Sequence, residues 1–137
     1  MIDACIAIHR DLGPGLLESV YELVLDGELK RRGLQVDRQV PIDIDFRGLS
    51  FPAAFRVDLM VERSLVLEIK SIEALSKAHG KQLLTYLRLT NLPVGLLLNF
   101  AGATMKEGIR RVVNDYRQSP DPSASPRLRV NQIGGGK

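Results

Sequence analysis

The stretch FRVDLMVERSLVLEIKS, residues 55–71, decides the fold because apolar and polar residues alternate along most of its length. Alternation with a period of two is typical of β-strands that bury one face. The interruption in the middle, residues 62–64, is short enough to be a hairpin turn. We therefore predict two half-buried antiparallel strands joined by a turn centred on Arg63, with Val61 facing Leu65.

The same register brings three charged side chains to one face of the hairpin. Asp58 would lie directly opposite Glu68, and Lys70 two residues further along the second strand. A slip of one residue would bury the carboxylates and expose the leucines, so the apolar pattern supports this register. Opposed residues have β-carbons about 4.5–5.5 Å apart, and like charges so placed repel each other. We therefore expect a cation between the two carboxylates, and two oxygen ligands with room for water suit Mg²⁺. The alternative is a solvated hairpin face on which Glu68 pairs with Lys70.

Composition places the chain among globular proteins of one domain. A chain of 137 residues is long enough to bury a core without disulfides or a structural metal. Its sequence contains no apolar run of membrane-spanning length and no basic-then-apolar signal peptide, so we expect a cytoplasmic protein. A single cysteine, Cys5, fits a reducing compartment and lies in an apolar helical pattern, which predicts a core thiol.

The positive charge is confined to the end of the chain. After residue 116 there are four basic residues and one acid, which accounts for the whole formal net charge of +3: Arg117, Arg127, Arg129 and Lys137 against Asp121. The rest of the chain is neutral, without the basic footprint of a protein that binds nucleic acid by charge alone. Nor does the sequence predict exposed aromatic residues for base stacking. Binding to a polyanion would then depend on metal.

Two helices are expected at the N-terminus, over residues 2–12 and 16–32, separated by Gly13-Pro14-Gly15. Glu18 lies in the first turn of the second helix, surrounded by apolar residues and on the same side as Tyr21. One interpretation is a surface glutamate favoured by the helix dipole. The other is a carboxylate that turns toward Asp58 and Glu68, because such a group needs a partner among apolar neighbours.

The remaining elements follow from the same periodicities. Residues 35–47 alternate as a strand, in which Pro41 indicates a sheet edge or a bulge. A helix over residues 76–90 would place His79, Gln82 and Tyr86 on one face. Residues 94–100 are almost continuously apolar, as in a strand buried on both faces, and the intervening helix implies a parallel partner for the strand of residues 65–70.

The end of the chain is expected to hold one more helix and a tail. Residues 106–116 have an amphipathic helical pattern, and from Ser119 onward proline, serine and glycine dominate. We therefore predict an α/β domain over residues 1–117 and a disordered tail over residues 118–137. The domain would have three layers, α/β/α, around a mixed four-stranded sheet, in the order helix, three strands, helix, strand, helix.

Together these pieces resemble the PD-(D/E)XK nuclease superfamily, which has a restriction-endonuclease-like core. The segments that carry the resemblance are GLLESVYE (15–22), RVDLMVE (56–62), LVLEIKS (65–71), QLLTYLRLT (82–90) and GLLLNF (95–100). GLLESVY is similar to the signature of the GxxExxY proteins, a bacterial family within that superfamily. Val57 stands where the superfamily motif has proline.

The resemblance implies roles for six residues. Asp58, Glu68 and Lys70 match the catalytic positions, and Glu18 matches an additional carboxylate on the first helix of some members. Glu18, Asp58 and Glu68 would hold Mg²⁺, with Mn²⁺ as a substitute. Gln82 and Tyr86 match a Q-x-x-x-Y pattern of helicase-associated nucleases and would bind the substrate or orient Lys70.

The function implied is metal-dependent hydrolysis of phosphodiester bonds in nucleic acid, with DNA favoured over RNA. The alternative is a domain that keeps the nuclease fold to bind nucleic acid or a protein without catalysis. Four matched polar groups, Glu18, Asp58, Glu68 and Lys70, favour the nuclease.

Overall fold

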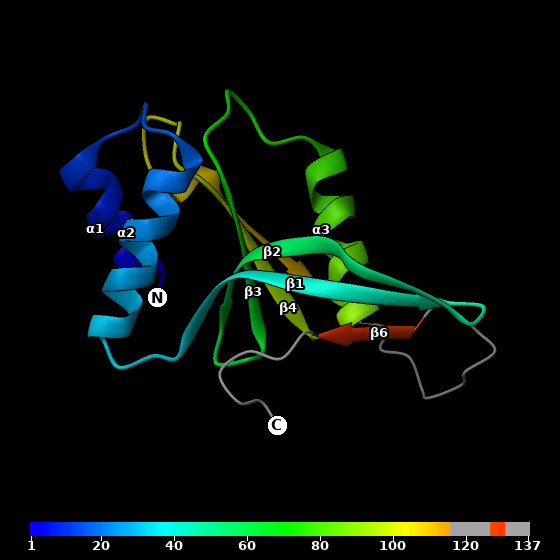
Figure 1. Ribbon diagram of the computed structural model, residues 1–137. Coiled ribbons are helices and arrows are strands. Elements are labelled where there is room, and N and C mark those ends of the chain that lie inside the picture. The colour runs from blue at the N-terminus through cyan, green and yellow to red at the C-terminus, as the bar shows by residue number, and fades with distance from the viewer. Residues whose placement is uncertain (116–126, 131–137) are drawn as a thin grey trace.

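The structure is a computed structural model that describes residues 1–115 and the backbone of residues 127–130 (Figure 1). Its elements are, in chain order, helices α1 (Ile2–Leu12) and α2 (Glu18–Arg31), strands β1 (Val36–Phe46), β2 (Leu49–Val61) and β3 (Leu65–Lys70), helix α3 (Lys77–Thr90), strand β4 (Val94–Asn99), the 3₁₀ turn η1 (Lys106–Gly108) and strands β5 (Ile109–Val113) and β6 (Arg127–Val130). No helix among the described residues has both the length and the apolar character needed to span a membrane.

The central hairpin forms as predicted. β2 and β3 are antiparallel, and Val61 pairs with Leu65. β4 lies beside β3 and parallel to it, as the intervening helix requires, with Leu65 opposite Val94. The strand order within the described part of the chain is β5-β4-β3-β2-β1-β6. The predicted mixed sheet is thus confirmed, but it has six strands rather than four.

The predicted three layers are present, with a separate apolar core on each side of the sheet. Helices α1 and α2 cover one face and α3 the other (Figure 1). Tyr21 and Leu25 of α2 pack with Leu67 of β3 in one core. Leu83 and Leu87 of α3 pack with Val66 in the other. Both faces of the central strands are therefore covered.

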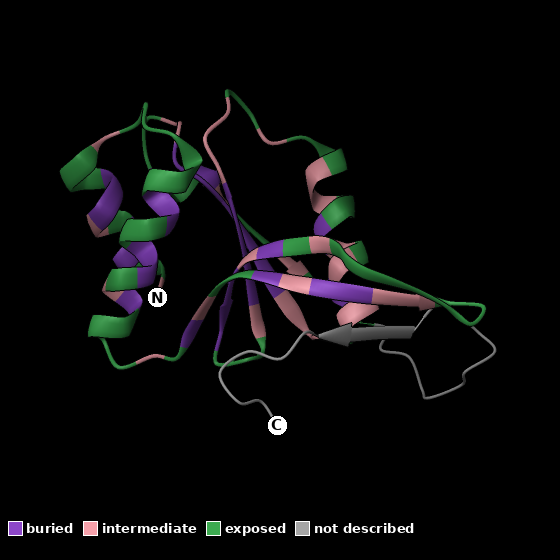
Figure 2. Ribbon diagram, viewed as in Figure 1, coloured by how far each residue is buried: buried purple, intermediate pink, exposed green. Residues whose placement is uncertain are grey.

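Burial on both faces corrects the prediction of half-buried strands. In β3, the four residues Val66–Ile69 are all buried, Glu68 included (Figure 2). In β3 the alternation correctly placed Leu67 and Ile69 on the side of α1 and α2, and Val66 on the side of α3. In β2 it did not hold throughout, since Val57 packs on the α3 side and Leu59 on the other. The alternation could not show that α3 would cover the polar face as well, because that depends on packing between distant segments. Glu68 is consequently not part of a solvated hairpin face.

The prediction of a helix over residues 106–116 was wrong. This segment forms η1 and then β5, which pairs antiparallel with β4, Val94 lying opposite Val113. Ile109, Val112 and Val113 have helical spacing, but β-branched residues favour strands, and β4 offers an open edge for hydrogen bonds. The tail prediction also fails in part, since residues 127–130 form β6 beside β1. Residues 116–126 and 131–137 lie outside the described part of the chain.

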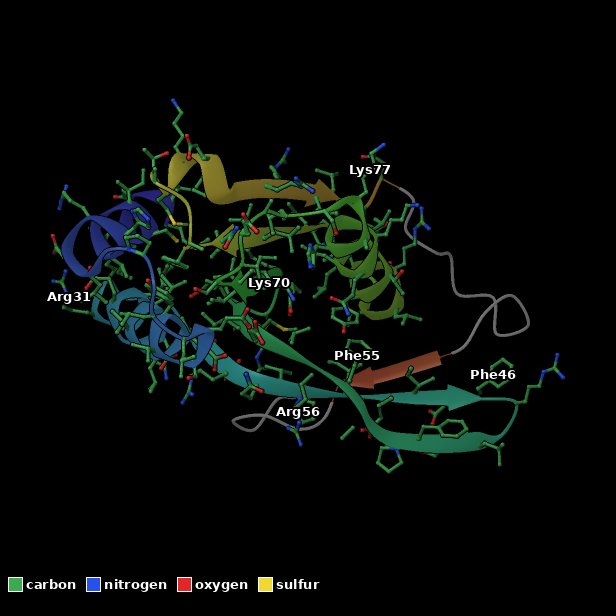
Figure 3. All side chains as sticks on the ribbon, turned by 90° about the horizontal axis from the view of Figure 1, so that it is seen from above. Arg31, Phe46, Phe55, Arg56, Lys70 and Lys77 are labelled. Carbon is green, nitrogen blue, oxygen red and sulfur yellow. The ribbon has the colours of Figure 1, made fainter. Side chains whose placement is uncertain are left out.

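β1 and β2 continue beyond β3 as a long arm, along which β6 lies beside β1 (Figures 1 and 3). The pairing register shifts between Ile42 and Ile44, where β2 holds extra residues. Asp43 stabilises this bulge by accepting a hydrogen bond from the backbone N–H of Ala53, which has a positive φ. Pro41 itself pairs regularly with Arg56, so the bulge lies in β2 and not at Pro41, where the sequence suggested an edge or a bulge.

Candidate functional site

The site begins where β2 and β3 separate. Their pairing ends at Leu59 and Leu67, and beyond that point two carboxylates accept the backbone hydrogen bonds. Glu68 Oε2 accepts from the backbone N–H of Asp58 at 3.2 Å, and Asp58 Oδ2 accepts from the backbone N–H of Ile69 at 2.8 Å. The two residues predicted to be cross-strand neighbours are therefore in contact.

Both carboxyl groups of this pair are held in surroundings that disfavour their charged forms. Glu68 is 6 % exposed, and this burial, with the nearby charge of Asp58, raises the pKa of Glu68 to about 8. Burial also raises the pKa of Asp58, against the opposing effects of the Ile69 N–H and Lys70. Neighbouring carboxylates that resist ionisation are common at functional sites, and a bound cation would favour their charged forms.

Lys70 is the last residue of β3 and lies half-buried at the centre of the molecule (Figure 3). Its charge lowers the pKa of both Asp58 and Glu68, which places it near the pair. The end of β3 is fixed to β4, since the Lys70 carbonyl accepts a hydrogen bond from the Phe100 N–H at 2.9 Å. The predicted triad of two carboxylates and one ammonium therefore forms at the end of the hairpin.

Glu18 reaches the rim of this site rather than its centre. It is the first residue of α2 and is exposed, and its Oε2 accepts a hydrogen bond from the backbone N–H of Ser71 at 3.1 Å. Its charge contributes to the raised pKa of Asp58. Glu18 is thus an exposed residue of the first turn, as the first interpretation has it, and its carboxylate also faces the end of β3.

Glu22 is a further carboxylate at the site that the sequence-based prediction missed. It lies one helical turn after Glu18 and is only 6 % exposed. Burial raises its pKa, the charge of Asp58 contributes, and Glu22 in turn raises the pKa of Glu68. The i, i+4 spacing from Glu18 could have indicated it, because such residues share a helix face.

A kink in β1 supplies the hydrogen-bond donors for Glu22. Gln39 has a φ of 51°, which lets two consecutive side chains turn toward α2. Gln39 Nε2 donates to Glu22 Oε1 at 2.8 Å, and Arg38 Nε donates to Glu22 Oε2 at 3.2 Å. Gln39 also lowers the pKa of Asp58, so it lies between the two carboxylates.

Of the two predicted residues on α3, Tyr86 belongs to the site. The carboxylates Glu68 and Asp58 both contribute, after burial, to a raised pKa of its hydroxyl. Its ring stacks on Phe55 of β2, with centroids 4.3 Å apart. Gln82 lies one turn earlier and is exposed. His79, predicted on the same face, instead closes the start of α3 by accepting the Ser76 N–H at 2.9 Å on its Nδ1.

The Gly15, Glu18, Tyr21 pattern has a structural explanation. Gly15 has a φ of 102°, a conformation that side-chain-bearing residues rarely adopt. The buried Tyr21 hydroxyl donates to the Gly13 carbonyl at 2.5 Å and accepts from the Leu16 N–H at 3.2 Å. The pattern therefore fixes the loop that precedes α2 and sets Glu18 beside the end of β3.

The donor set fits a hard divalent cation, because it consists of carboxylate oxygens next to each other in a partly buried position. Among the described residues, however, no three His, Cys, Asp or Glu side chains are already arranged to hold a metal ion. Asp58 and Glu68 each use an oxygen on a backbone N–H, and Glu18 is committed to Ser71. Joint ligation by these three residues requires side-chain movement.

Comparison with protein families gives a match to the PD-(D/E)XK nuclease superfamily over residues 1–112. The chain belongs to this superfamily, whose nucleases generally use divalent metal ions. Comparison with curated proteins gave no match, and neither did comparison with solved structures.

Proposed function

We propose that this protein is a nuclease that hydrolyses phosphodiester bonds with the help of Mg²⁺, and that DNA is its main substrate. The observation that carries this proposal is the mutual contact of Asp58 and Glu68 where β2 and β3 separate, with Lys70 beside them. A buried carboxylate pair with raised pKa values weakens the fold, so a role for the pair in binding a cation is the simplest reason for its presence.

Asp58 and Glu68 are the groups best suited to hold the metal, and Glu18 would join them from the rim. When bound, a divalent ion supplies positive charge that polarises a phosphoryl oxygen. The carboxylates would exchange their present backbone hydrogen bonds for the cation. Glu22 is already satisfied by Arg38 and Gln39, so we assign it to holding Gln39 and the adjacent Asp58 in place.

Lys70 is proposed to act on the substrate rather than on the metal. Its ammonium group carries three donors and no acceptor, so it can orient a water molecule and offset the negative charge that grows on the phosphate. Tyr86 would contribute its hydroxyl from α3, near the same carboxylates. Gln82, exposed one turn away, would contact the phosphate backbone.

The test is cleavage of labelled single- and double-stranded DNA and RNA in Mg²⁺, in Mn²⁺ and in EDTA. We expect wild type to cut DNA only with metal. Asp58→Asn and Glu68→Gln should each lose at least about 100-fold in rate, because removal of one site charge commonly costs several kcal/mol of transition-state stabilisation. Lys70→Ala should lose turnover but keep the metal-induced rise in melting temperature.

Matched variants separate these effects from general damage. Asp11→Asn removes an exposed carboxylate of α1, and Lys106→Ala removes an exposed ammonium of η1. Both should cleave like wild type. If wild type shows neither metal-dependent cleavage nor a metal-induced thermal shift, the nuclease proposal is rejected, and a non-catalytic domain that binds nucleic acid or protein takes its place.

A further inference from the structure

The tip of the β1–β2 arm presents a largely exposed apolar face. Phe46 pairs with Leu49, and Ile44 pairs with Phe51. Paired residues of neighbouring strands point to the same side of a sheet, and so do residues two apart along a strand. These four residues, Ile44, Phe46, Leu49 and Phe51, therefore share one side, which we call the apolar arm face.

The aromatic rings of this face are accessible. Phe46 is 43 % exposed, Phe51 is 45 % exposed, and Leu49 beside them is 61 % exposed. This corrects the expectation from sequence that no aromatic residue would be available for stacking. The two rings come from strands that the hairpin turn Arg47-Gly48 joins, and both turn residues have positive φ.

The apolar arm face is continuous with the candidate active site. Two residues before Ile44, Ile42 is buried and pairs with Phe55, whose ring stacks on Tyr86. Figure 3 shows Lys70, Phe55 and Phe46 in this order from the site to the tip of the arm. Ile42 and Phe46 are four strand residues apart, which corresponds to about 13 Å. The exposed part of the path, from Ile42 to the tip, is thus a few nucleotides long.

Charge on the arm is arranged to leave this face free of carboxylates. Asp43 and Asp45 alternate with Ile44 and therefore belong to the opposite side, where Asp43 bonds the Ala53 N–H. At the tip, the guanidinium carbon of Arg47 lies 5.3 Å from the centre of the Phe46 ring. Aromatic rings beside an arginine and without nearby acids are the usual means of binding unpaired bases.

We propose that the apolar arm face binds the unpaired bases of a single-stranded segment of the substrate, by stacking on Phe46 and Phe51. This inference rests on the proposed nuclease function and adds a substrate class to it: nucleic acid with a single-stranded stretch next to the bond that is cut. Arg47 would neutralise a phosphate between the stacked bases.

The test uses the fact that the chain contains no tryptophan. In Phe46→Trp, the introduced indole is the only one and keeps the ability to stack. Addition of a 15-nucleotide oligothymidylate in EDTA should quench its fluorescence. An abasic strand of equal length and charge should quench it at least about tenfold less effectively, because stacking contributes on the order of 1–3 kcal/mol per base.

A second experiment measures the affinity for the oligothymidylate by anisotropy. Phe46→Ala/Phe51→Ala should bind the oligothymidylate at least about tenfold more weakly than wild type. Ile6→Ala, an exposed apolar residue of α1, should bind like wild type. Far-UV circular dichroism and thermal melting should show that all variants are folded, and Phe46→Trp should retain the wild-type affinity.

Three outcomes would overturn the inference: equal binding of base-bearing and abasic strands, no binding of either, or unchanged affinity in the double alanine variant. Light scattering can reveal a fourth outcome. If wild type is a dimer, and the double variant is a monomer that still binds the oligonucleotide, the face is a contact between copies of the chain.

The results also separate the two proposals. Cleavage by wild type with unchanged binding in the double variant would reject the arm face alone. Base-dependent binding with neither cleavage nor a metal-induced thermal shift would reject the nuclease and keep the arm face.

Discussion

At the scale of single residues, the site is defined by what burial does to ionisable groups. Glu68 and Cys5 are both buried, and burial disfavours the charged form of each. For Glu68 the neighbouring Asp58 adds to the effect, which indicates a site made for positive charge. Cys5 is a residue of α1 that packs in the core, and burial is the main cause of its raised pKa.

Glu68 should make the metal-free protein less stable as the pH rises. Its pKa is about 8 in the folded protein and ordinarily 4.5, so the folded state holds the proton more tightly. Its contribution to stability is therefore complete below about pH 4.5 and is lost as the pH rises to 8, by up to about 1.4 kcal/mol per pH unit. Urea unfolding in EDTA from pH 5 to 8.5 measures this.

Glu68→Gln should flatten that pH dependence, because the amide does not titrate. Glu107→Gln, which changes an exposed glutamate of η1, should leave the slope as in wild type. Parallel stability curves for wild type and Glu68→Gln would contradict the raised pKa.

Cys5 should be unreactive in the folded protein. Its side chain is fully buried, and burial raises its pKa to about 12, so almost no thiolate exists at pH 8. We expect iodoacetamide to modify the native protein more than about 100-fold more slowly than the protein in urea. Mass spectrometry of the intact chain gives both rates, since Cys5 is the only cysteine. Similar rates in the two states would contradict this prediction.

At the scale of elements, η1 packs against the end of β4 so closely that no side chain fits between them. A β-carbon on Gly108 would lie 1.9 Å from the Asn99 carbonyl oxygen. Asn99 itself is buried, and its amide bonds both the N–H and the carbonyl of Ile72. This packing holds the loop after Lys70 against β4 and so supports the site.

Gly108→Ala should therefore destabilise the protein by roughly 3 kcal/mol or more, because η1 or β4 must move to admit the methyl group. Gly27→Ala is the matched control. Gly27 lies within α2 with nothing within 4 Å of an added β-carbon, so alanine there should stabilise by about 0.5–1 kcal/mol. Urea unfolding measures both. Equal effects of the two substitutions would show that the contact at Asn99 is unimportant.

At the scale of the whole molecule, the arm and the end of the chain depend on each other. β6 pairs with β1 from Ile42 to Asp45, which is the part of the arm next to the bulge. Without β6, this edge of β1 would lose its hydrogen-bond partner. The sheet of six strands thus includes a segment that composition alone had assigned to a disordered tail.

A chain that ends at residue 117 should consequently melt several degrees below the full chain, since loss of 1 kcal/mol lowers Tm by roughly 2–8 °C in domains of this size. A chain that ends at Val130 keeps β6 and should melt like the full protein. Differential scanning calorimetry of the three proteins, without metal, gives the comparison. Equal melting temperatures for all three would show that β6 adds nothing to stability.

The sequence by itself determined the features that depend on local periodicity. These are the hairpin register with its Asp58–Glu68 contact, the position of Lys70, the three main helices, and the parallel strand β4. Each follows from spacing along one or two adjacent segments, where a change of one residue would reverse which face is apolar.

Only the tertiary structure decided the features that join distant segments. The burial of Glu68 requires α3 over the polar face, and the place of Glu22 beside Gln39 requires the kink in β1. β5 became a strand because β4 offered an unpaired edge, although its spacing also suits a helix. Packing and edge pairing are set by the whole chain at once, because the free energy of each contact depends on which segment arrives there.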